Sequence, residues 1–186
     1  MRLTISLVGL LLAFALAGCE GYAPPGPDNQ PSLVQNYLLD SGDQVRVTVF
    51  GQADLTNTYE VDKGGHIVVP LIGQVTARGT TTTAVADEIG TRLRRNFVKN
   101  PDVSVEVARY RPFFIMGEVA SGGQYQYVAG LTVQQAVAIA GGFSPRANRT
   151  LVDVTRQSAG REITLVARLT DPVFPGDTVN IRERLF

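Results

Sequence analysis

The chain has 186 residues, in which 17 Lys and Arg balance 17 Asp and Glu, with one histidine and one cysteine. This length allows one ordinary domain or two small ones. The balanced charge argues against a nucleic-acid partner, because the chain has no excess of positive charge to attract a polyanion. A single cysteine and a single histidine cannot supply a zinc ligand set, so we expect no metal site and no other cofactor.

The N-terminus has the pattern of a lipoprotein leader. Arg2 precedes an apolar run from Thr4 to Leu16, which is typical of a signal-peptide core and is too short to span a bilayer comfortably. Cleavage before Cys19 would leave an N-terminal thiol, which bacterial lipoprotein maturation links to diacylglycerol. Two or more acyl chains anchor a protein stably. We therefore predict a signal peptide over residues 1–18 and lipidation at Cys19; a buried core cysteine is the alternative.

Residues 19–36 read as a tether that follows the lipidated cysteine. Half of the residues from Gly21 to Ser32 are glycine or proline, and no hydrophobic period runs through them. At about 3.1 Å per residue in an extended state, this segment could hold the folded part up to roughly 50 Å from the lipid surface.

Folded structure is expected to begin near Tyr37. Alternating valines from Val45 to Val49 predict a half-buried strand, and the same alternation recurs from Val103 to Val107. The segments from Tyr59 to Asp62 and from His66 to Val69 flank Lys63-Gly64-Gly65 and predict a hairpin. Pro70 and Gly73 bracket a short apolar step that follows it.

One amphipathic helix is predicted between these strands. The hydroxyls of Thr80 to Thr83 can cap it, and Val85, Ile89 and Leu93 share one face. Asn100-Pro101 is expected to stop it. Residues 37–109 would then form the first folded domain.

A second cycle of elements starts after Arg111-Pro112. Thr132 can cap a helix whose apolar face begins at Val133 and includes Ala136, Val137 and Ala140, and Gly141-Gly142 would end it in the left-handed conformation that glycine tolerates. Strands are expected over residues 113–116, 124–128, 151–155, 163–169 and 178–182. Residues 110–186 would form the second domain, so the fold class is α+β, with each half a small sheet and one helix.

The residues do not assemble a recognisable catalytic set. The one histidine, His66, lies at a predicted turn, and no nucleophile elbow, phosphate loop or metalloprotease motif occurs. Glycoside cleavage needs only two carboxylates, about 5 to 10 Å apart across one cleft, so a carbohydrate-active enzyme remains open. Turn chemistry explains the carboxylates that lie at predicted turns or strand starts, because an Asp after Gly can accept hydrogen bonds from backbone amides. These are Asp43, Glu60, Asp62, Glu118 and Asp177.

A loop after the second helix is a candidate anion contact. It runs from Gly141 to Pro145 beside Arg146 and Arg149, and a simple helix stop is the alternative reading. Only Lys63 and Lys99 are lysines among the 17 basic residues. Arginine favours planar, bidentate contact with carboxylates and phosphates, which makes an acidic polymer conceivable.

Several motifs in fixed order resemble a known family. Residues 37–43 (YLLDSGD), 62–73 (DKGGHIVVPLIG) and 100–103 (NPDV) resemble the N-terminal domain of the bacterial polysaccharide biosynthesis/export family. Residues 117–119 (GEV) and 140–142 (AGG), with the late Arg156, resemble the soluble ligand-binding β-grasp (SLBB) domain. The resemblance implies a β-grasp second domain and shaping, non-catalytic roles for Gly42, Asp43, Asp62, Gly65, Pro70, Gly73, Pro101, Gly117, Glu118, Gly141 and Gly142.

The resemblance also implies a function without catalysis. Family members are lipoprotein subunits that form homo-oligomeric rings, conduct polysaccharide (capsule or exopolysaccharide) across the periplasm and dock on an inner-membrane polysaccharide co-polymerase. Long members add a C-terminal amphipathic helix that forms the outer-membrane pore, whereas Phe186 follows a predicted strand. We therefore expect a collar anchored by lipid on the periplasmic face of the outer membrane, with a separate outer-membrane pore protein. The alternative is a monomeric lipoprotein that binds a small glycan or other ligand through its β-grasp half.

Overall fold

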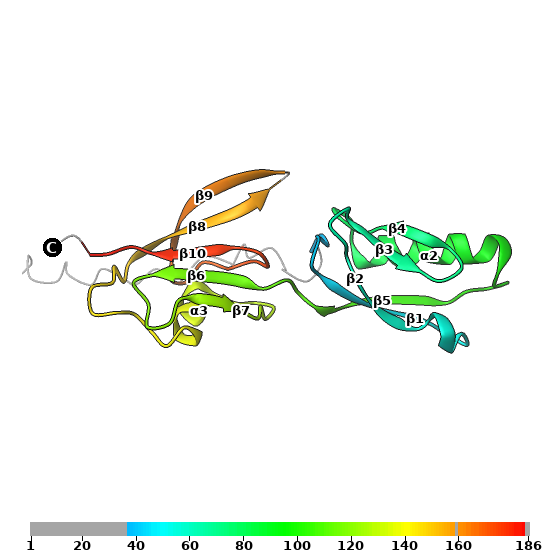
Figure 1. The fold of residues 1–186 in the computed structure, drawn as a ribbon, viewed down its shortest axis with the longest axis horizontal. Helices are drawn as coiled ribbons and strands as arrows, with labels where there is room; N and C mark the ends of the chain where they lie inside the picture. Colours follow the sequence, from blue (N-terminus) through cyan, green and yellow to red (C-terminus); the bar gives the residue numbers. More distant parts are fainter. Residues whose placement is uncertain (1–36, 159, 185–186) are drawn as a thin grey trace, which may run out of the picture. The chain divides into compact units, whose positions relative to one another are not determined.

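The computed structural model describes residues 37–158 and 160–184 (Figure 1). The predicted signal peptide, Cys19 and the tether lie outside the described residues, so the predictions made for them stay predictions. None of the helices in the described part is long and apolar enough to cross a membrane.

Residues 37–109 form an antiparallel sheet, a separate hairpin and one long helix. The sheet has the order β2-β1-β5, with β1 (Gln44–Val49) paired on both sides. Val45, Val47 and Val49 are buried while the residues between them are more exposed, as the alternation predicted. The remaining elements are the 3-10 turn η1 (Ala53–Leu55), β2 (Asn57–Glu60), β3 (His66–Val69), β4 (Gly73–Thr76), α2 (Thr82–Asn96) and β5 (Val103–Arg109).

Helix α2 begins and packs as its sequence predicted. The Thr81 hydroxyl accepts a hydrogen bond from the Ala84 backbone N–H at 3.2 Å, which satisfies one of the free amides of the first turn. Val85, Ile89 and Leu93 are buried on one face. The helix ends at Asn96, ahead of the predicted stop at Asn100-Pro101, because the chain leaves the helical conformation at the Phe97 cap.

The predicted hairpin between residues 59–62 and 66–69 is wrong. β2 pairs with β1, and β3 pairs instead with β4, the strand that follows it. Only a tight turn joins β2 to β3, in which the His66 backbone N–H donates to Asp62 Oδ1 at 2.8 Å. The true hairpin tip is at Leu71, which has a left-handed φ of 69°, and Gly73, at φ 72°. Alternation marks each strand but does not identify its partner, which is why the sequence misassigned this pair.

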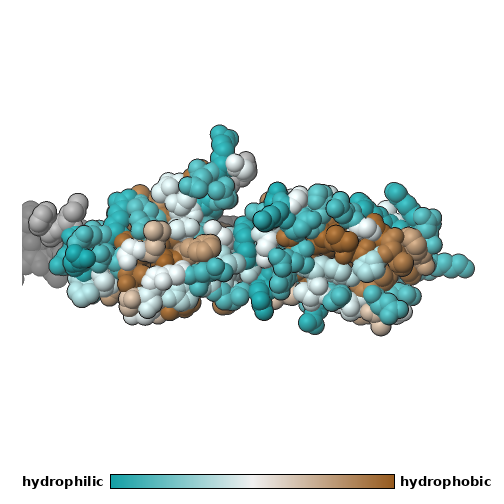
Figure 2. Space-filling model, viewed as in Figure 1, coloured by the Kyte–Doolittle hydropathy of each residue, from teal (hydrophilic) through white to brown (hydrophobic). Residues whose placement is uncertain are grey.

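The tip of this hairpin contributes exposed apolar surface. Val68 and Leu71 are about three-fifths exposed, at 59% and 61%. Figure 2 shows hydrophobic surface gathered over β3, β4 and α2 in this view.

Residues 110–184 form a five-stranded mixed sheet with one short helix. Its order is β7-β6-β10-β8-β9, in which β10 pairs parallel with β6 and antiparallel with β8. The predicted strand over residues 124–128 is shorter and starts earlier, at β7. The elements are β6 (Phe113–Gly117), β7 (Gly123–Tyr125), α3 (Val133–Ile139), β8 (Leu151–Ser158), β9 (Arg161–Arg168) and β10 (Thr178–Ile181).

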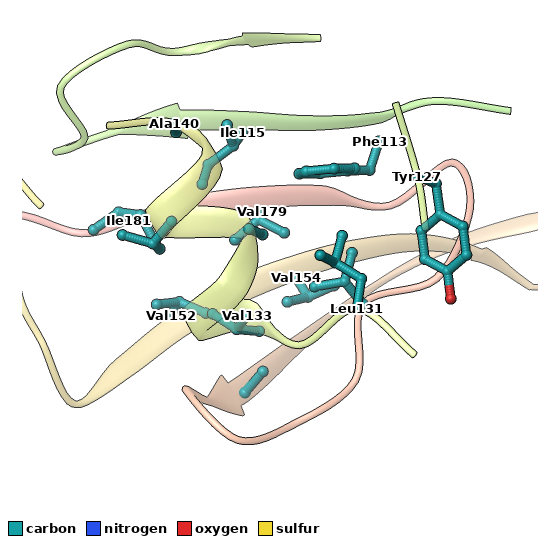
Figure 3. Packing of buried hydrophobic residues seen from close by; sticks show 14 of the residues in the cluster. Phe113, Ile115, Tyr127, Leu131, Val133, Ala140, Val152, Val154, Val179 and Ile181 are labelled. Carbon is teal, nitrogen blue, oxygen red and sulfur yellow. The ribbon is translucent and has the colours of Figure 1, made fainter. Parts of the chain in front are cut away.

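Helix α3 supplies one wall of the second core. Thr132 and Gln135 form a capping box at its start. Val133, Ala136, Val137 and Ala140 are all buried, as predicted. Figure 3 shows Val133 and Ala140 facing strand residues such as Ile115, Val152 and Val179, which belong to the same cluster. Each half has its own hydrophobic cluster, so the predicted α+β class is confirmed.

The outer edge of the second sheet is long and incompletely covered. β9 is eight residues long and pairs only with β8 along its length. Figure 1 shows the β8–β9 ribbon extending away from β6 and β10. Ile163, Leu165 and Val166 on β9 are 38%, 44% and 58% exposed. An edge of this kind offers backbone hydrogen-bonding groups and apolar side chains to another strand.

Candidate functional site

Two Gly-Asp turns hold the only fully buried charges among the described residues. Asp43 and Asp177 each have no exposed area, and each follows a glycine with a left-handed φ, Gly42 or Gly176. Each carboxylate accepts a hydrogen bond from the backbone N–H three residues before it, at 2.9 Å for Asp43 and 2.8 Å for Asp177. This is the amide-binding role that turn chemistry predicted for both residues.

The Asp43 carboxylate also organises the start of the folded chain. It accepts hydrogen bonds from the Tyr37 hydroxyl at 2.6 Å and from the Arg111 backbone N–H at 2.9 Å. The Arg111 guanidinium lies 3.3 Å from the same carboxylate. Burial raises the pKa of Tyr37, and the hydrogen bond to Asp43 raises it further. Asp43 therefore ties together three segments and has no free oxygen directed to a substrate.

Asp177 is matched by an arginine that also stacks on an aromatic ring. Arg156 donates from Nε and Nη2 to the two carboxylate oxygens of Asp177, at 2.8 and 2.6 Å. Its guanidinium lies 4.0 Å from the centroid of the Phe174 ring. This bidentate geometry neutralises the buried carboxylate and gives Arg156, which the family resemblance singled out, a structural role.

Arg111 is a structural residue that sequence reasoning missed. Its side chain lies against both Gly-Asp turns: a Cβ on Gly176 would come within 2.6 Å of Arg111 Nε, and a Cβ on Gly42 within 3.6 Å of Arg111 Cβ. The recurrence of Gly-Asp in the two halves was the available signal, but nothing in the sequence connected it to Arg111.

The other motif residues of the first half shape turns. Asp62 accepts from the His66 amide, and this backbone hydrogen bond is the main reason that the pKa of Asp62 lies below its usual value. Gly65 has a φ of 87°, and a Cβ there would lie 2.6 Å from Arg78 Cβ. Pro70 precedes the left-handed tip at Leu71. Pro101 lies between α2 and β5.

A second group of motif residues meets at one end of the second sheet. Gly117 has a φ of 84°, and a side chain there would overlap the carbonyl oxygen of Ile181. The next residue, Glu118, accepts a hydrogen bond from the Ser144 hydroxyl. Gly141 and Gly142, both left-handed, turn the chain after α3 so that Ser144 reaches Glu118. The structure thus brings together motif residues that are 23 or more positions apart in the sequence.

The two predicted anion-contact residues, Arg146 and Arg149, have different surroundings in the structure. Arg146 lies 3.4 Å from a Glu118 oxygen and 3.2 Å from a Glu183 oxygen, so its charge is balanced by two carboxylates. Arg149 instead lines a groove, and its guanidinium lies 5.9 Å from the centre of the Phe143 ring.

We call this groove the arginine groove. It has a volume of about 580 Å³, and its lining combines three arginines, one glutamate and four uncharged residues: Arg149, Arg182, Arg184, Glu183, Pro145, Ala147, Asn148 and Thr150. Arg182 and Arg184 were not predicted as contacts. Glu183 is the single carboxylate in this lining, whereas the glycosidase hypothesis needs two that face one cleft.

Within residues 37–158 and 160–184, no three His, Cys, Asp or Glu side chains gather as a metal-binding group. His66 is part-exposed at the start of β3, with Nδ1 3.9 Å from Asp62 Oδ1. The chemistry that the arginine groove offers is positive charge and hydrogen-bond donation.

Comparison with known proteins defines the class in which this fold belongs. The family model described as polysaccharide biosynthesis/export protein matches residues 31–108, and the SLBB domain matches residues 112–167. The chain therefore contains one domain similar to each of these two families. A relative, the exopolysaccharide production protein ExoF of Rhizobium meliloti (strain 1021), is 35% identical over 130 residues. That alignment covers 63% of this chain and 31% of the relative, so the chain spans about a third of the relative's length.

Proposed function

We propose that this protein is a lipid-anchored, non-enzymatic subunit of a complex that carries a polysaccharide, a capsular or free exopolysaccharide, to the outer membrane of a bacterium. The observation that carries the proposal is the order of the two matched domains, export domain first and SLBB domain second. The exopolysaccharide production protein among its relatives supports the same process. Both families are export proteins, and family members are associated with the cell envelope.

The anchor in this proposal is Cys19. Acyl chains on this residue would hold the folded part near the periplasmic face of the membrane at the end of the tether, residues 20–36. The test is a Cys19→Ser variant of the full chain, expressed in a lipoprotein-processing bacterium and fed with radiolabelled palmitate. The proposal expects label and membrane retention in the wild type only. Label retained in Cys19→Ser would contradict it.

The same proposal assigns self-association to the long edge of the second sheet. β9 and the three-residue strand β7 are the two edges of one sheet, so pairing β9 of one copy with a different surface of the next gives a head-to-tail contact. Repeated head-to-tail contacts close into a ring when the rotation between copies closes. Ile163 and Leu165 lie on one face of β9 and Val166 on the other, so exposed apolar side chains flank this edge on both faces of the sheet.

Two equally exposed valines provide a matched test of this contact. Val166 on β9 is 58% exposed and Val68 on β3 is 59% exposed. Val166→Lys should dissociate a ring of the purified full chain in detergent, because a charge would enter the apolar contact, while Val68→Lys should leave it intact. Mass measurement and negative-stain micrographs give the readout. Equal assembly of the two variants would refute the role of β9.

The remaining partners follow from the family. The proposal includes an inner-membrane polysaccharide co-polymerase below the collar and a separate outer-membrane pore protein above it. The test is passage of polymer or ions through liposomes that contain this chain alone, for which the proposal expects none. Passage by this chain alone would overturn the need for a separate pore.

A monomeric glycan-binding lipoprotein is the second candidate function. One observation favours it: all residues of the arginine groove belong to the second half of the chain. A strict monomer at high concentration, with no ring in micrographs and with glycan bound, would select this function over the collar.

A further inference from the structure

We propose that the arginine groove binds the carboxylate groups of an acidic polysaccharide. This inference rests on the proposed export function and adds the chemical class of the cargo. It concerns a site formed by two segments, residues 145–150 and 182–184, which follow α3 and β10 respectively.

The two segments are joined by backbone hydrogen bonds. The Asn148 N–H donates to the Arg182 carbonyl at 2.9 Å, and the Arg184 N–H donates to the Arg146 carbonyl at 2.7 Å. Ala147, which pairs with Glu183 in an isolated bridge, is buried in the second core. The backbone that carries the groove arginines is therefore held in place by these hydrogen bonds. This reduces the conformational entropy that is lost when a ligand binds.

The charged side chains that line the groove differ in whether they have an ion-pair partner. Arg182 is paired with Asp153, and Glu183 is paired with Arg146. Among the residues that the structure describes, Arg149 and Arg184 form no ion pair with a carboxylate. Two guanidinium groups are thus left to bind an external anion, with Asn148 and Thr150 beside them as neutral hydrogen-bonding groups.

The lining favours an acidic glycan over a neutral one. No residue that lines the groove is aromatic, so the flat apolar platforms on which neutral sugar faces stack are missing from its wall. Guanidinium groups pair bidentately with carboxylates, such as those of uronic acids or of acidic sugar substituents. The contacts are exposed and therefore weak and screened by salt, which suits a polymer that must be released after each contact.

The experiment measures binding to the full chain in non-ionic detergent by calorimetry. The probes are an oligogalacturonate and an uncharged malto-oligosaccharide of the same length. We expect measurable affinity for the acidic probe only, falling as salt rises. Arg149→Gln combined with Arg184→Gln should weaken it about tenfold, the loss of two charge-assisted contacts.

Two further variants guard against misfolding and against general charge effects. Arg161→Gln removes an exposed positive charge on β9, outside the groove, and should leave affinity unchanged. Glu183→Gln removes the one acidic group from the lining and should strengthen binding several-fold, which an unfolded variant could not do.

The inference is overturned by equal binding of both probes, by no binding of either, or by an equal loss in Arg161→Gln and in the double variant. Each of these outcomes leaves the export function standing, because that function is tested separately by the loss of surface glycan on gene deletion. A normal surface glycan after deletion, with the acidic probe still bound in the groove, would instead remove the proposed function and keep the site.

Discussion

The Asp177–Arg156 pair should be among the largest single contributions to the stability of the second half. Asp177→Ala removes the acceptor of three hydrogen bonds, one from the Phe174 amide and two from Arg156, at a position with no exposed area. Removing one partner of a buried ion pair costs about 3 to 5 kcal/mol. The Arg156 side chain is 26% exposed and can regain some water, so we expect the lower end, about 3 kcal/mol.

A double-mutant cycle separates the pair from its surroundings. Arg156→Ala leaves the fully buried Asp177 carboxylate with the Phe174 amide as its remaining partner and should cost more, about 4 to 5 kcal/mol. The double variant should cost less than the sum of the two by about 2 kcal/mol, because neither group is then left unpaired. Far-UV circular dichroism during urea unfolding of the purified chain gives these values. Arg161→Ala, an exposed arginine on β9, is the control and should change stability by less than about 0.5 kcal/mol.

The reasoning is refuted if Asp177→Ala unfolds within about 1 kcal/mol of the wild type, or if the costs of the two single variants simply add. Either result would mean that the carboxylate and the guanidinium are hydrated in the folded state.

Three further substitutions test separate parts of the fold. Gly117→Ala should cost at least about 3 kcal/mol, because its φ of 84° and the Ile181 carbonyl both exclude a side chain; an unchanged melting temperature contradicts this. The hydrogen bond from Arg182 lowers the pKa of Asp153 below its usual 3.8. The stability this pair adds is present above pH 3.8 and lost as the pH falls further, so Asp153→Asn should flatten the acid side of a plot of melting temperature against pH. Identical acid sides in wild type and variant would oppose that assignment. Leu71→Asn should raise the unfolding free energy by about 0.5 to 1 kcal/mol, since Asn tolerates the left-handed backbone at φ 69°. An unfolding free energy below that of the wild type, measured in urea, would count against this reasoning.

The helices and most strands could be predicted because their signals are local. A threonine cap and three apolar residues at helical spacing sufficed for α2, and the same logic worked for α3. Alternation marks a strand but does not identify which of the strands beside it in the sequence is its partner. The sequence for this reason placed β3 correctly but gave it the wrong partner, β2 in place of β4.

Only the part of the candidate site with a local sequence signal could be predicted. Arg149 stood out because it follows the Gly-Gly helix stop in the sequence. Arg182 and Arg184 join it only through backbone pairing of residues 182–184 with residues 146–148, more than 30 positions earlier. Arg146 looked equivalent to Arg149 in the sequence, and only the folded chain reveals that Glu118 and Glu183 balance its charge.

The most direct test of export is the amount of polysaccharide at the cell surface after the gene is deleted and then restored. The account predicts that deletion abolishes surface and released glycan while cytoplasmic sugar precursors persist, that the full chain restores export, and that Cys19→Ser and Val166→Lys restore it poorly. A deletion strain with wild-type surface and released glycan would contradict the account.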